Sequence, residues 1–293
     1  MVRFRQMTMK KKRAILFGTA VILLALIVWT AWGNTALELN TYMVESSDLP
    51  EAYDGYCIAH VSDLHNAEMG SGNERLLTML QESEPDIIAI TGDLIDSRNT
   101  NVKVALDFAE KAMQIAPGCY VTGNHEARVP EYNDLKTGLE ASGVVVLENE
   151  RMEIILSGET ITLLGVDDPS FQTDYLFGDA ASVISAKLTE ITPEEDGFTV
   201  LLSHRPELFD TYVESGMDLV LSGHAHGGQF RLPFVGGLVA PNQGLFPKYD
   251  SGLYTEAGTS MIVSRGIGNS ILPFRFNNHP EVILIELQTI DDK

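Results

Sequence analysis

Residues 86–96 read Asp-Ile-Ile-Ala-Ile-Thr-Gly-Asp-Leu-Ile-Asp, and the fold class follows from this segment. Its apolar run, Asp86–Ile90, predicts a β-strand. Two carboxylates, Asp93 and Asp96, come directly after that run. In open α/β sheets, ligands bind at the carboxyl ends of the strands. The segment therefore predicts an α/β sheet with acidic side chains at its ligand-binding edge.

Four other predicted strands end in the same way, in Asp, His or Asn. Tyr56–Val61 is followed by Ser62-Asp63-Leu64-His65, and Cys119–Val121 by Thr122-Gly123-Asn124-His125-Glu126. Phe198–Leu202 is followed by Ser203-His204, and Asp218–Leu221 by Ser222-Gly223-His224-Ala225-His226. Five of the seven histidines lie in these segments, which predicts one shared site. The alternative is that these residues only cap the strand ends.

Strand and helix patterns alternate in the first half of the chain, and several strands follow one another in the second half. Helical patterns span Asn73–Glu82, Val102–Ile115, Asn133–Ala141 and Ala180–Leu188. This order predicts stacked sheets with helices outside. We expect an α/β domain over residues 36–290, a four-layer αββα sandwich of two mixed sheets.

The residue types at the five strand ends indicate metal binding. Imidazole, carboxylate and amide groups without a thiolate suit Mn, Fe, Zn, Co or Ni. Asp63-x-His65 and His224-x-His226 each place two side chains on one side of an extended segment. Seven candidate ligands suit two ions about 3.5–4 Å apart that share one carboxylate. These candidates are Asp63, His65, Asp93, Asn124, His204, His224 and His226.

In this order, the motifs Asp-x-His, Gly-Asp-x-x-Asp, Gly-Asn-His-Glu, a lone His and Gly-His-x-His resemble the calcineurin-like metallophosphoesterase superfamily over residues 55–230. The stretch Gly223–Gln229 resembles its membrane-associated bacterial branch, which more often has Thr where this chain has Ala225. The resemblance implies a phosphoesterase with two divalent ions. It assigns Asp63, His65 and His226 to one ion, assigns Asn124, His204 and His224 to the other, and makes Asp93 the bridge.

The resemblance also implies a mechanism, in which hydroxide activated between the two ions attacks phosphorus. His125 is the expected general acid for the leaving oxygen, or a charge stabiliser. Asp96 is expected to pair with His125, raising its pKa and fixing its tautomer; the alternative is a simple turn residue. Asn124 and His125 are expected to contact the substrate. Arg98 stands one position later than the arginine of some relatives, so no phosphate contact is assigned to it.

Three other polar residues near these motifs are given structural roles. His60, within a predicted strand, is expected in the core or behind the site. Glu126 is expected to start a helix. His279, before Pro280, is expected in a surface loop. Cys57 and Cys119 are expected to be buried, inert thiols.

The N-terminus is predicted to be a membrane segment. Six basic residues precede residue 14, and no acidic residue occurs before Glu38. Ala14–Trp32 would form a helix of about 28 Å, roughly the thickness of the bilayer hydrocarbon. Residues 1–13 are predicted to be cytoplasmic, 14–32 to be a signal anchor, and the body to be extracytoplasmic at the cell membrane. The alternative is a cleaved signal peptide with a small-x-small site at Ala31 and Gly33, and a secreted body.

The charge balance limits the partners. With 20 Lys and Arg against 41 Asp and Glu, the net charge of -21 argues against nucleic-acid binding. No protein partner is indicated. The expected substrate is a phosphodiester or pyrophosphate-linked envelope component. Apolar residues in 227–260, with Phe234 and Phe246, and in Leu272–Phe276 suggest a rim for a lipid-linked substrate, although plain packing over the sheet explains them equally well. The alternatives are a phosphomonoesterase and a catalytically silent metal-binding scaffold at the membrane.

Overall fold

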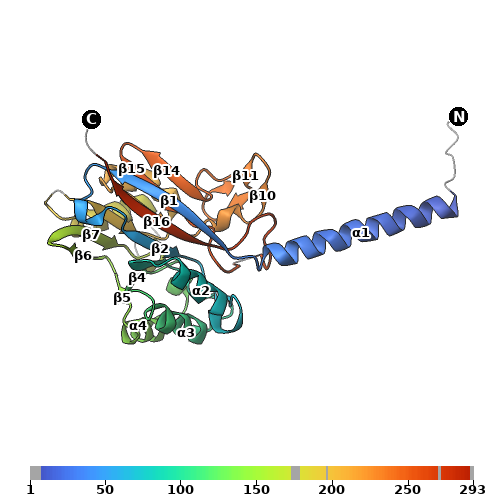
Figure 1. The fold of residues 1–293 in the computed structure, drawn as a ribbon, viewed down its shortest axis with the longest axis horizontal. Helices are drawn as coiled ribbons and strands as arrows, with labels where there is room; N and C mark the ends of the chain where they lie inside the picture. The colour runs from blue at the N-terminus through green and yellow to red at the C-terminus, as the bar shows by residue number, and fades with distance from the viewer. Residues whose placement is uncertain (1–7, 173–178, 196, 270–271, 291–293) are drawn as a thin grey trace.

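The computed structural model describes residues 8–172, 179–195, 197–269 and 272–290. It consists of a layered body and one long helix, α1 (Met9–Gly33), that projects from it (Figure 1). Residues 1–7 of the predicted basic segment lie outside the described residues.

The first sheet has six strands and is mixed. Its order is β1 (Glu38–Ser46), β16 (Glu281–Thr289), β2 (Cys57–Val61), β3 (Ile87–Thr91), β4 (Gly118–Val121) and β5 (Val145–Val146). Neighbours are parallel except β16 and β2, which are antiparallel. Every residue of β3 is buried, as expected for an apolar strand covered on both faces.

The second sheet also has six strands and is mixed. Its order is β14 (Gly252–Glu256), β15 (Thr259–Val263), β9 (Leu219–Ser222), β8 (Thr199–Leu202), β7 (Glu159–Gly165) and β6 (Glu150–Leu156). The two edge pairs, β14 with β15 and β6 with β7, are antiparallel, and the inner pairs are parallel.

Helices cover the outer face of each sheet, so the body has four layers. α2 (Glu74–Glu82), α3 (Val102–Ala112) and α4 (Tyr132–Ala141) pack on the first sheet through residues such as Leu80, Phe108 and Leu139 (Figure 1). α5 (Ala180–Ile191) and α6 (Phe209–Glu214) pack on the second. A third apolar cluster lies between the sheets and includes Ile58 and Val200. The predicted αββα sandwich is therefore confirmed.

The register of the sheets brings the five polar segments to one edge. In the first sheet, Val61 pairs with Ile90 and Thr91 with Val121, so β2, β3 and β4 end together. In the second, Leu202 pairs with Leu221, so β8 and β9 end together. β3 contacts both β8 and β9 across the sandwich. The carboxyl ends of five strands therefore face one another.

Some elements differ from the sequence prediction. Residues 227–260, expected to be irregular, contain two short hairpins, β10 (Arg231–Leu232) with β11 (Gly236–Gly237) and β12 (Val239–Ala240) with β13 (Gly244–Leu245), and the edge strand β14. β14 has a mostly exposed pattern that gives little apolar signal. α6 has only six residues, too few to show helical periodicity. Cys57 is half-buried, whereas Cys119 is fully buried as expected.

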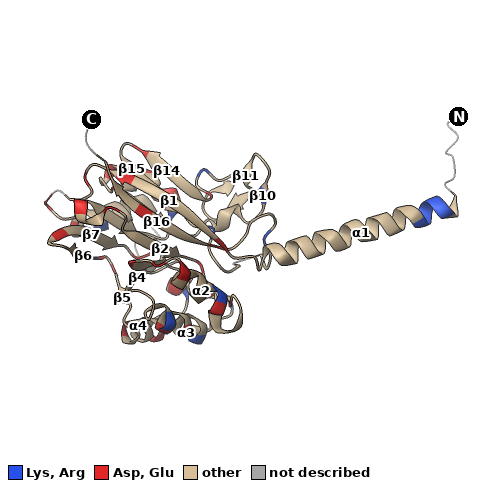
Figure 2. Ribbon diagram, in the orientation of Figure 1, with Lys and Arg blue, Asp and Glu red and all other residues tan. Residues whose placement is uncertain are grey.

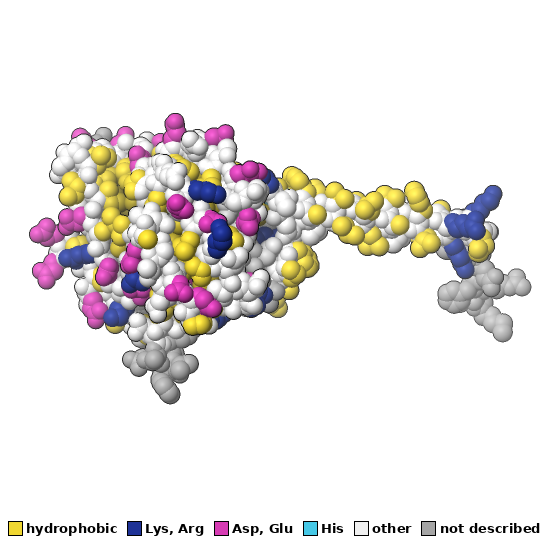
Figure 3. Space-filling model, turned by 90° about the horizontal axis from the view of Figure 1, so that it is seen from below, with side chains coloured by type: hydrophobic (Ala, Val, Ile, Leu, Met, Phe, Trp, Pro, Cys, Tyr) yellow, Lys and Arg dark blue, Asp and Glu magenta, His cyan; other side chains and the backbone are white. Residues whose placement is uncertain are grey.

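α1 is the one helix among the described residues that is long and apolar enough to cross a membrane. Its large hydrophobic side chains are exposed and cover the face seen in Figure 3, and basic residues lie at its far end (Figures 2 and 3). Its length and composition fit a membrane anchor or a signal sequence. At the other end, the Trp32 ring contacts His279 at 4.9 Å, so His279 is half-buried against the helix and not simply a surface residue.

Candidate dimetal centre

Three of the predicted ligands form a first cluster. Asp63 Oδ1 lies 3.2 Å from His226 Nε2 and 3.6 Å from His65 Nε2. The two imidazole nitrogens are 3.1 Å apart. All three residues are buried, so these atoms form a compact group of potential ligands.

A second cluster lies beside the first. Asp93 Oδ2 is 3.2 Å from His204 Nε2, which is 3.2 Å from His224 Nδ1. His204 Nδ1 donates a hydrogen bond to the carbonyl of Thr91 at 2.7 Å. A carbonyl can only accept, so in the neutral ring, the form that binds a metal, Nε2 of His204 keeps a lone pair for a cation.

Asp93 stands between the clusters. Its Oδ2 is 3.5 Å from His65 Nε2 in the first cluster and 3.2 Å from His204 Nε2 in the second. Its Oδ1 accepts the backbone N–H of His125 at 2.8 Å, which holds Oδ2 toward both groups. One carboxylate oxygen is thus shared, as two neighbouring ions require.

The backbone is strained where the ligands are attached. The left-handed region holds Asp63, His65, Asp93, His224 and His226, with φ between 45° and 65°. Residues other than glycine rarely adopt this conformation, and it clusters at functional sites.

Glycines next to the ligands allow the strand ends to approach one another. A Cβ at Gly123 would collide with the carboxylate of Asp93, and one at Gly223 would collide with Ser62 and Asp63. These close approaches explain the glycine in front of Asn124 and the one in front of His224.

The residues present fit divalent metal ions. Asp63 Oδ1 and Asn124 Oδ1 are buried without a hydrogen-bond partner among the described residues. Such orphaned acceptors are costly unless a cation satisfies them. Burial raises the pKa of Asp93, but the neighbouring His204 and His65 outweigh it, and the pKa lies well below its usual range. The carboxylate is therefore ionised, as a metal ligand must be.

His125 lies over the clusters, but its partners differ from the prediction. The backbone N–H of Ser97 donates to His125 Nδ1 at 3.0 Å, so this nitrogen is an acceptor and Nε2 carries the proton. Asp96 Oδ1 lies 3.6 Å from Nδ1 and accepts hydrogen bonds from Arg98 instead. The tautomer is thus set by Ser97 rather than by Asp96. Burial lowers the pKa of His125 to about 4, outweighing the opposing effects of Asp93 and Asp96, whereas the prediction was a raised pKa.

His60 and Glu126 lie behind the ligands. His60 is buried and its Nε2 lies 2.7 Å from Thr91 Oγ1, as expected for a core histidine, and burial lowers its pKa to about 3. Glu126 starts a short helical turn as predicted, but its fully buried carboxylate also accepts backbone N–H bonds from Asp93, Gly123 and Ile95.

Three arginines line a cavity of about 200 Å³ over the metal-ligand clusters; the sequence reasoning assigned no phosphate contact to one of them, Arg98, and missed the other two. They are Arg98, Arg128 and Arg205. Arg128 and Arg205 stand close to His125 and His204 in sequence, and that adjacency was the available signal.

Arg205 is held by a buried ion pair. Its guanidinium forms two hydrogen bonds to the carboxylate of Asp168, and its Nη1 atom lies 3.2 Å from His224 Nε2. Burial raises the pKa of Asp168, but the hydrogen bonds and charge of Arg205 outweigh it and lower the pKa. Asn242 Nδ2 also lies 3.2 Å from His224 Nε2. No sequence motif marks Asp168 or Asn242.

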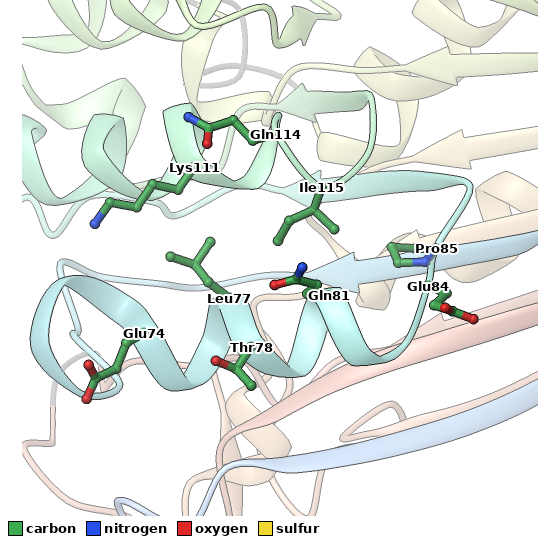
Figure 4. A pocket seen from close by; sticks show the side chains of 9 residues that line it. All are labelled: Glu74, Leu77, Thr78, Gln81, Glu84, Pro85, Lys111, Gln114 and Ile115. Carbon is green, nitrogen blue, oxygen red and sulfur yellow. The ribbon is translucent and has the colours of Figure 1, made fainter.

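A larger cavity, about 690 Å³, lies elsewhere, between α2 and α3 (Figure 4). Its walls include Glu74, Leu77, Gln81, Lys111 and Ile115. None of its nine lining residues is a histidine or belongs to the strand-end motifs, so size alone does not locate the site.

Comparison with known proteins agrees with this geometry. The family model described as calcineurin-like phosphoesterase matches residues 57–228. YkoQ of Bacillus subtilis (strain 168), named an uncharacterized metallophosphoesterase, is 28% identical over 274 residues, which cover 92% of this chain and 97% of that protein. Phosphodiesterase YaeI of Escherichia coli (strain K12) is 28% identical over 209 residues, covering 70% of this chain and 72% of that protein.

A solved structure gives the same fold. The crystal structure of TT1561 of Thermus thermophilus superposes with a TM-score of 0.50 at 14% identity, covering 73% of this chain and 90% of that one. The match to the family model extends from β2 to the residues just after the fifth motif and so includes all five strand ends. The chain therefore belongs to the calcineurin-like phosphoesterases, a dimetal-dependent family of hydrolases that act on phosphoester bonds.

Proposed function

We propose that this protein is a membrane-anchored phosphoesterase that hydrolyses a phosphodiester or pyrophosphate-linked substrate of the cell envelope. The observation that carries the proposal is the position of Asp93, whose Oδ2 lies within 3.5 Å of an imidazole from each cluster. A structural role alone does not require one buried carboxylate to face two groups of imidazoles.

The seven predicted ligands are assigned to two ions. Asp63, His65 and His226 would hold one ion, and Asn124, His204 and His224 the other, with Asp93 shared. Two such metal ions, when bound, would lower the pKa of a water molecule between them and neutralise charge on the phosphoryl group. The donor set suits Mn, Fe, Zn, Co or Ni.

His125 is assigned to the leaving group. Because Nδ1 accepts the N–H of Ser97, the neutral ring presents its Nε2–H as a hydrogen-bond donor to the leaving oxygen of the ester; transfer of a proton to that oxygen would require the imidazolium form. Asp96 acts indirectly, since it holds Arg98 at the cavity through two side-chain hydrogen bonds. We infer that Asn124, beside His125, also contacts the substrate.

The arginines support a substrate with more than one anionic group. Arg98, Arg128 and Arg205 line one small cavity in a chain of net charge -21. Guanidinium groups bind phosphate oxygens through several N–H donors at once. The relative YaeI is named a phosphodiesterase, which supports a phosphodiester as the substrate.

We infer the location from α1. Lys10, Lys11, Lys12 and Arg13 lie at its N-terminal end, which favours that end in the cytoplasm. The body, residues 36–290, would then lie outside the cytoplasm, next to envelope substrates. The segments 1–13 and 14–32 remain our assignment of the cytoplasmic part and the anchor.

The test is a substrate panel on the full chain, purified in detergent and loaded with Mn²⁺. We expect faster hydrolysis of a diester or a diphosphate ester than of a monoester with the same leaving group. The Asp93→Asn variant should lose this activity. A preference for the monoester would replace the proposal by a phosphomonoesterase, and no turnover with any substrate at full metal loading would favour a metal-binding scaffold.

A further inference from the structure

We propose that the body has its own bilayer-docking surface, which lies beside α1 and inserts into the leaflet where that helix ends. The surface consists of the loop Leu272–Phe276, the tip of the β10–β11 hairpin at Phe234, and Phe246, which directly follows β13 at the base of the β12–β13 hairpin. This inference rests on the proposed anchoring by α1. The experiment below distinguishes failure of the docking surface from failure of the anchoring by α1.

The loop runs alongside the helix rather than beyond its end. Pro273 and Phe274 form an apolar groove with Ile27, Thr30 and Ala31, and the groove extends along α1 to Leu23. Ile27 lies about 10 Å along the helix axis from Asn34, at 1.5 Å per residue. If α1 crosses the bilayer, these loop residues are at the depth of the hydrocarbon.

Hydrogen bonds fix the loop to the end of the helix. Asn34 Nδ2 donates to the carbonyl of Arg275 at 2.9 Å, and the N–H of Arg275 donates to Asn34 Oδ1 at 2.7 Å. The Arg275 side chain is itself buried and donates to the carbonyl of Arg265 at 2.6 Å. The loop is therefore held in place on both its helix side and its body side.

The β10–β11 hairpin continues the same surface. The rings of Phe230 and Phe274 are 5.4 Å apart, and the N–H of Arg231 donates to the carbonyl of Phe276 at 3.0 Å. At the hairpin tip, Phe234 is 109% exposed with φ of 66°. A fully exposed phenylalanine in the left-handed region contributes nothing to the core, which indicates an external contact.

The next hairpin carries a second exposed phenylalanine. Leu245 is 69% and Phe246 is 60% exposed, and Phe246 has φ of 56°. The two hairpins are connected, since the N–H of Phe246 donates to the carbonyl of Leu238 at 2.9 Å and the N–H of Leu238 to the carbonyl of Phe230 at 2.8 Å. β10 and β11 lie at the end of the body from which α1 leaves (Figure 1).

The charge distribution favours a lipid surface as the occupant. Residues 226–249 and 257–280 contain no Asp or Glu in a chain that has 41. Arg231 and Lys248 lie near the two hairpins, where Arg231 pairs with Asp250 at 3.1 Å and Lys248 lies 3.7 Å from Asp210; the ribbon of β10 and β11 themselves carries no acidic residue (Figure 2). Aromatic side chains next to basic residues are typical of segments that lie in the bilayer interface. Hydrophobic side chains of the body also lie beside the base of α1 (Figure 3).

The docking surface adjoins the proposed active site. Pro241 and Asn242, in the turn between β12 and β13, line the cavity over the metal-ligand clusters. Leu245 and Phe246 follow in the same hairpin. A phosphoester carried by a membrane lipid would therefore reach this cavity without leaving the bilayer surface.

The experiment measures fluorescence quenching by brominated phosphatidylcholine in vesicles that hold the full chain. Trp29 and Trp32 are the two native tryptophans, so their quenching reports insertion of α1. In a Trp29→Phe/Trp32→Phe background, Phe234→Trp and Phe274→Trp report the docking surface. Ile155→Trp is the matched control, because Ile155 is exposed on the edge strand β6, which lies at the end of the body opposite α1 (Figure 1).

We expect strong quenching at positions 234 and 274 and none at 155. Quenching of the native tryptophans without quenching at 234 and 274 would overturn the docking surface and leave the anchor intact; a protein partner on this face would give that result. Absence of quenching at the native tryptophans would overturn the anchor, and the docking surface with it. None of these outcomes depends on turnover, so they are independent of the assigned reaction.

Discussion

The carboxylate of Glu126 accepts the backbone N–H of Asp93 at 2.9 Å, so a fully buried acid positions the residue shared by the two clusters. The same carboxylate accepts the N–H groups of Gly123 at 2.8 Å and Ile95 at 3.2 Å. Glu126 thus joins the loop after β3 to the loop after β4. The position of Asp93 relative to Asn124 therefore depends on this connection.

Replacing Glu126 by Gln should therefore weaken both stability and metal binding. The amide has one acceptor oxygen, and its NH₂ group would face backbone donors that need acceptors. A buried donor without a partner costs about 1–3 kcal/mol, so we expect a loss of that order in the free energy of unfolding. Urea unfolding and metal content measure the two effects. Glu153→Gln, at an exposed position on β6, should change neither. Unchanged stability of Glu126→Gln would show that its bonds to the loops are replaceable.

Two ligand variants should separate the shared position from a position in one cluster. Asp93 Oδ2 faces both groups, whereas His226 Nε2 belongs to the first. We expect Asp93→Asn to lower the bound metal from two ions toward none, and His226→Ala to remove about one. Elemental analysis after gel filtration gives the stoichiometry. Equal losses in the two variants would contradict the shared role of Asp93.

His125→Ala should reduce turnover most for esters with poor leaving groups. Removing a general acid costs about 10²–10⁴-fold when the leaving oxygen needs its proton. A nitrophenolate leaves without that help, so the loss should be smaller for nitrophenyl esters than for alkyl esters. The metal content should stay unchanged. An equal loss for both leaving groups would assign His125 to charge stabilisation at the phosphoryl group.

Much of the site could be predicted because each ligand directly follows an apolar run. The strand ends at Val61, Ile90 and Leu221 are visible in the sequence, and parallel strands end at one edge. The fold class followed from the same pattern. The contacts of β3 with β8 and β9 bring the segments together in space, and these contacts form only when the two sheets pack on each other.

The parts that the sequence did not predict depend on long-range contacts or on short elements. Asp168 meets Arg205 across 37 positions, and nothing local marks Asp168 or indicates that the two side chains pair. The tautomer of His125 is set by a backbone N–H, that of Ser97, which has no sequence signature. The short hairpins in residues 227–260 are built from strands of two residues, too few for an alternating pattern.

The buried pair of Asp168 and Arg205 makes a pH-dependent contribution to stability. Arg205 lowers the pKa of Asp168 below the unfolded value of about 3.9. The contribution is therefore complete above about pH 4 and is lost as the pH falls through the lowered pKa. Asp168→Asn leaves the buried guanidinium with the carboxylate of Glu207, at 3.3 Å, as its remaining acidic partner, so the cost should stay at or below the roughly 3–5 kcal/mol of a fully unpaired buried charge.

We therefore expect the stability difference between wild type and Asp168→Asn to be large near neutral pH and to shrink below about pH 4. Urea unfolding with a chelator present measures it without a contribution from metal binding. Asp107→Asn, which removes a half-exposed helix carboxylate paired with Lys103, is the control and should show only a small difference at any pH. If the stability difference for Asp168→Asn stays constant down to low pH, protonation of Asp168 is not linked to unfolding.

Arg128 should determine how well the site binds a second anionic group. Its side chain is exposed at the cavity that holds His125, and no acidic side chain among the described residues lies within 4.0 Å of its guanidinium. Arg98 and Arg205, in contrast, already pair with carboxylates. Arg128 is therefore the cavity arginine whose charge is best placed for a phosphate beyond the scissile one. We expect Arg128→Ala to raise KM about tenfold for a diphosphate ester, the order of one exposed charged hydrogen bond, and to leave KM for a simple diester nearly unchanged. Arg151→Ala on β6 is the matched control. The split between the two substrates is the decisive readout, because a general loss of folding or metal would raise KM or lower kcat for both of them alike.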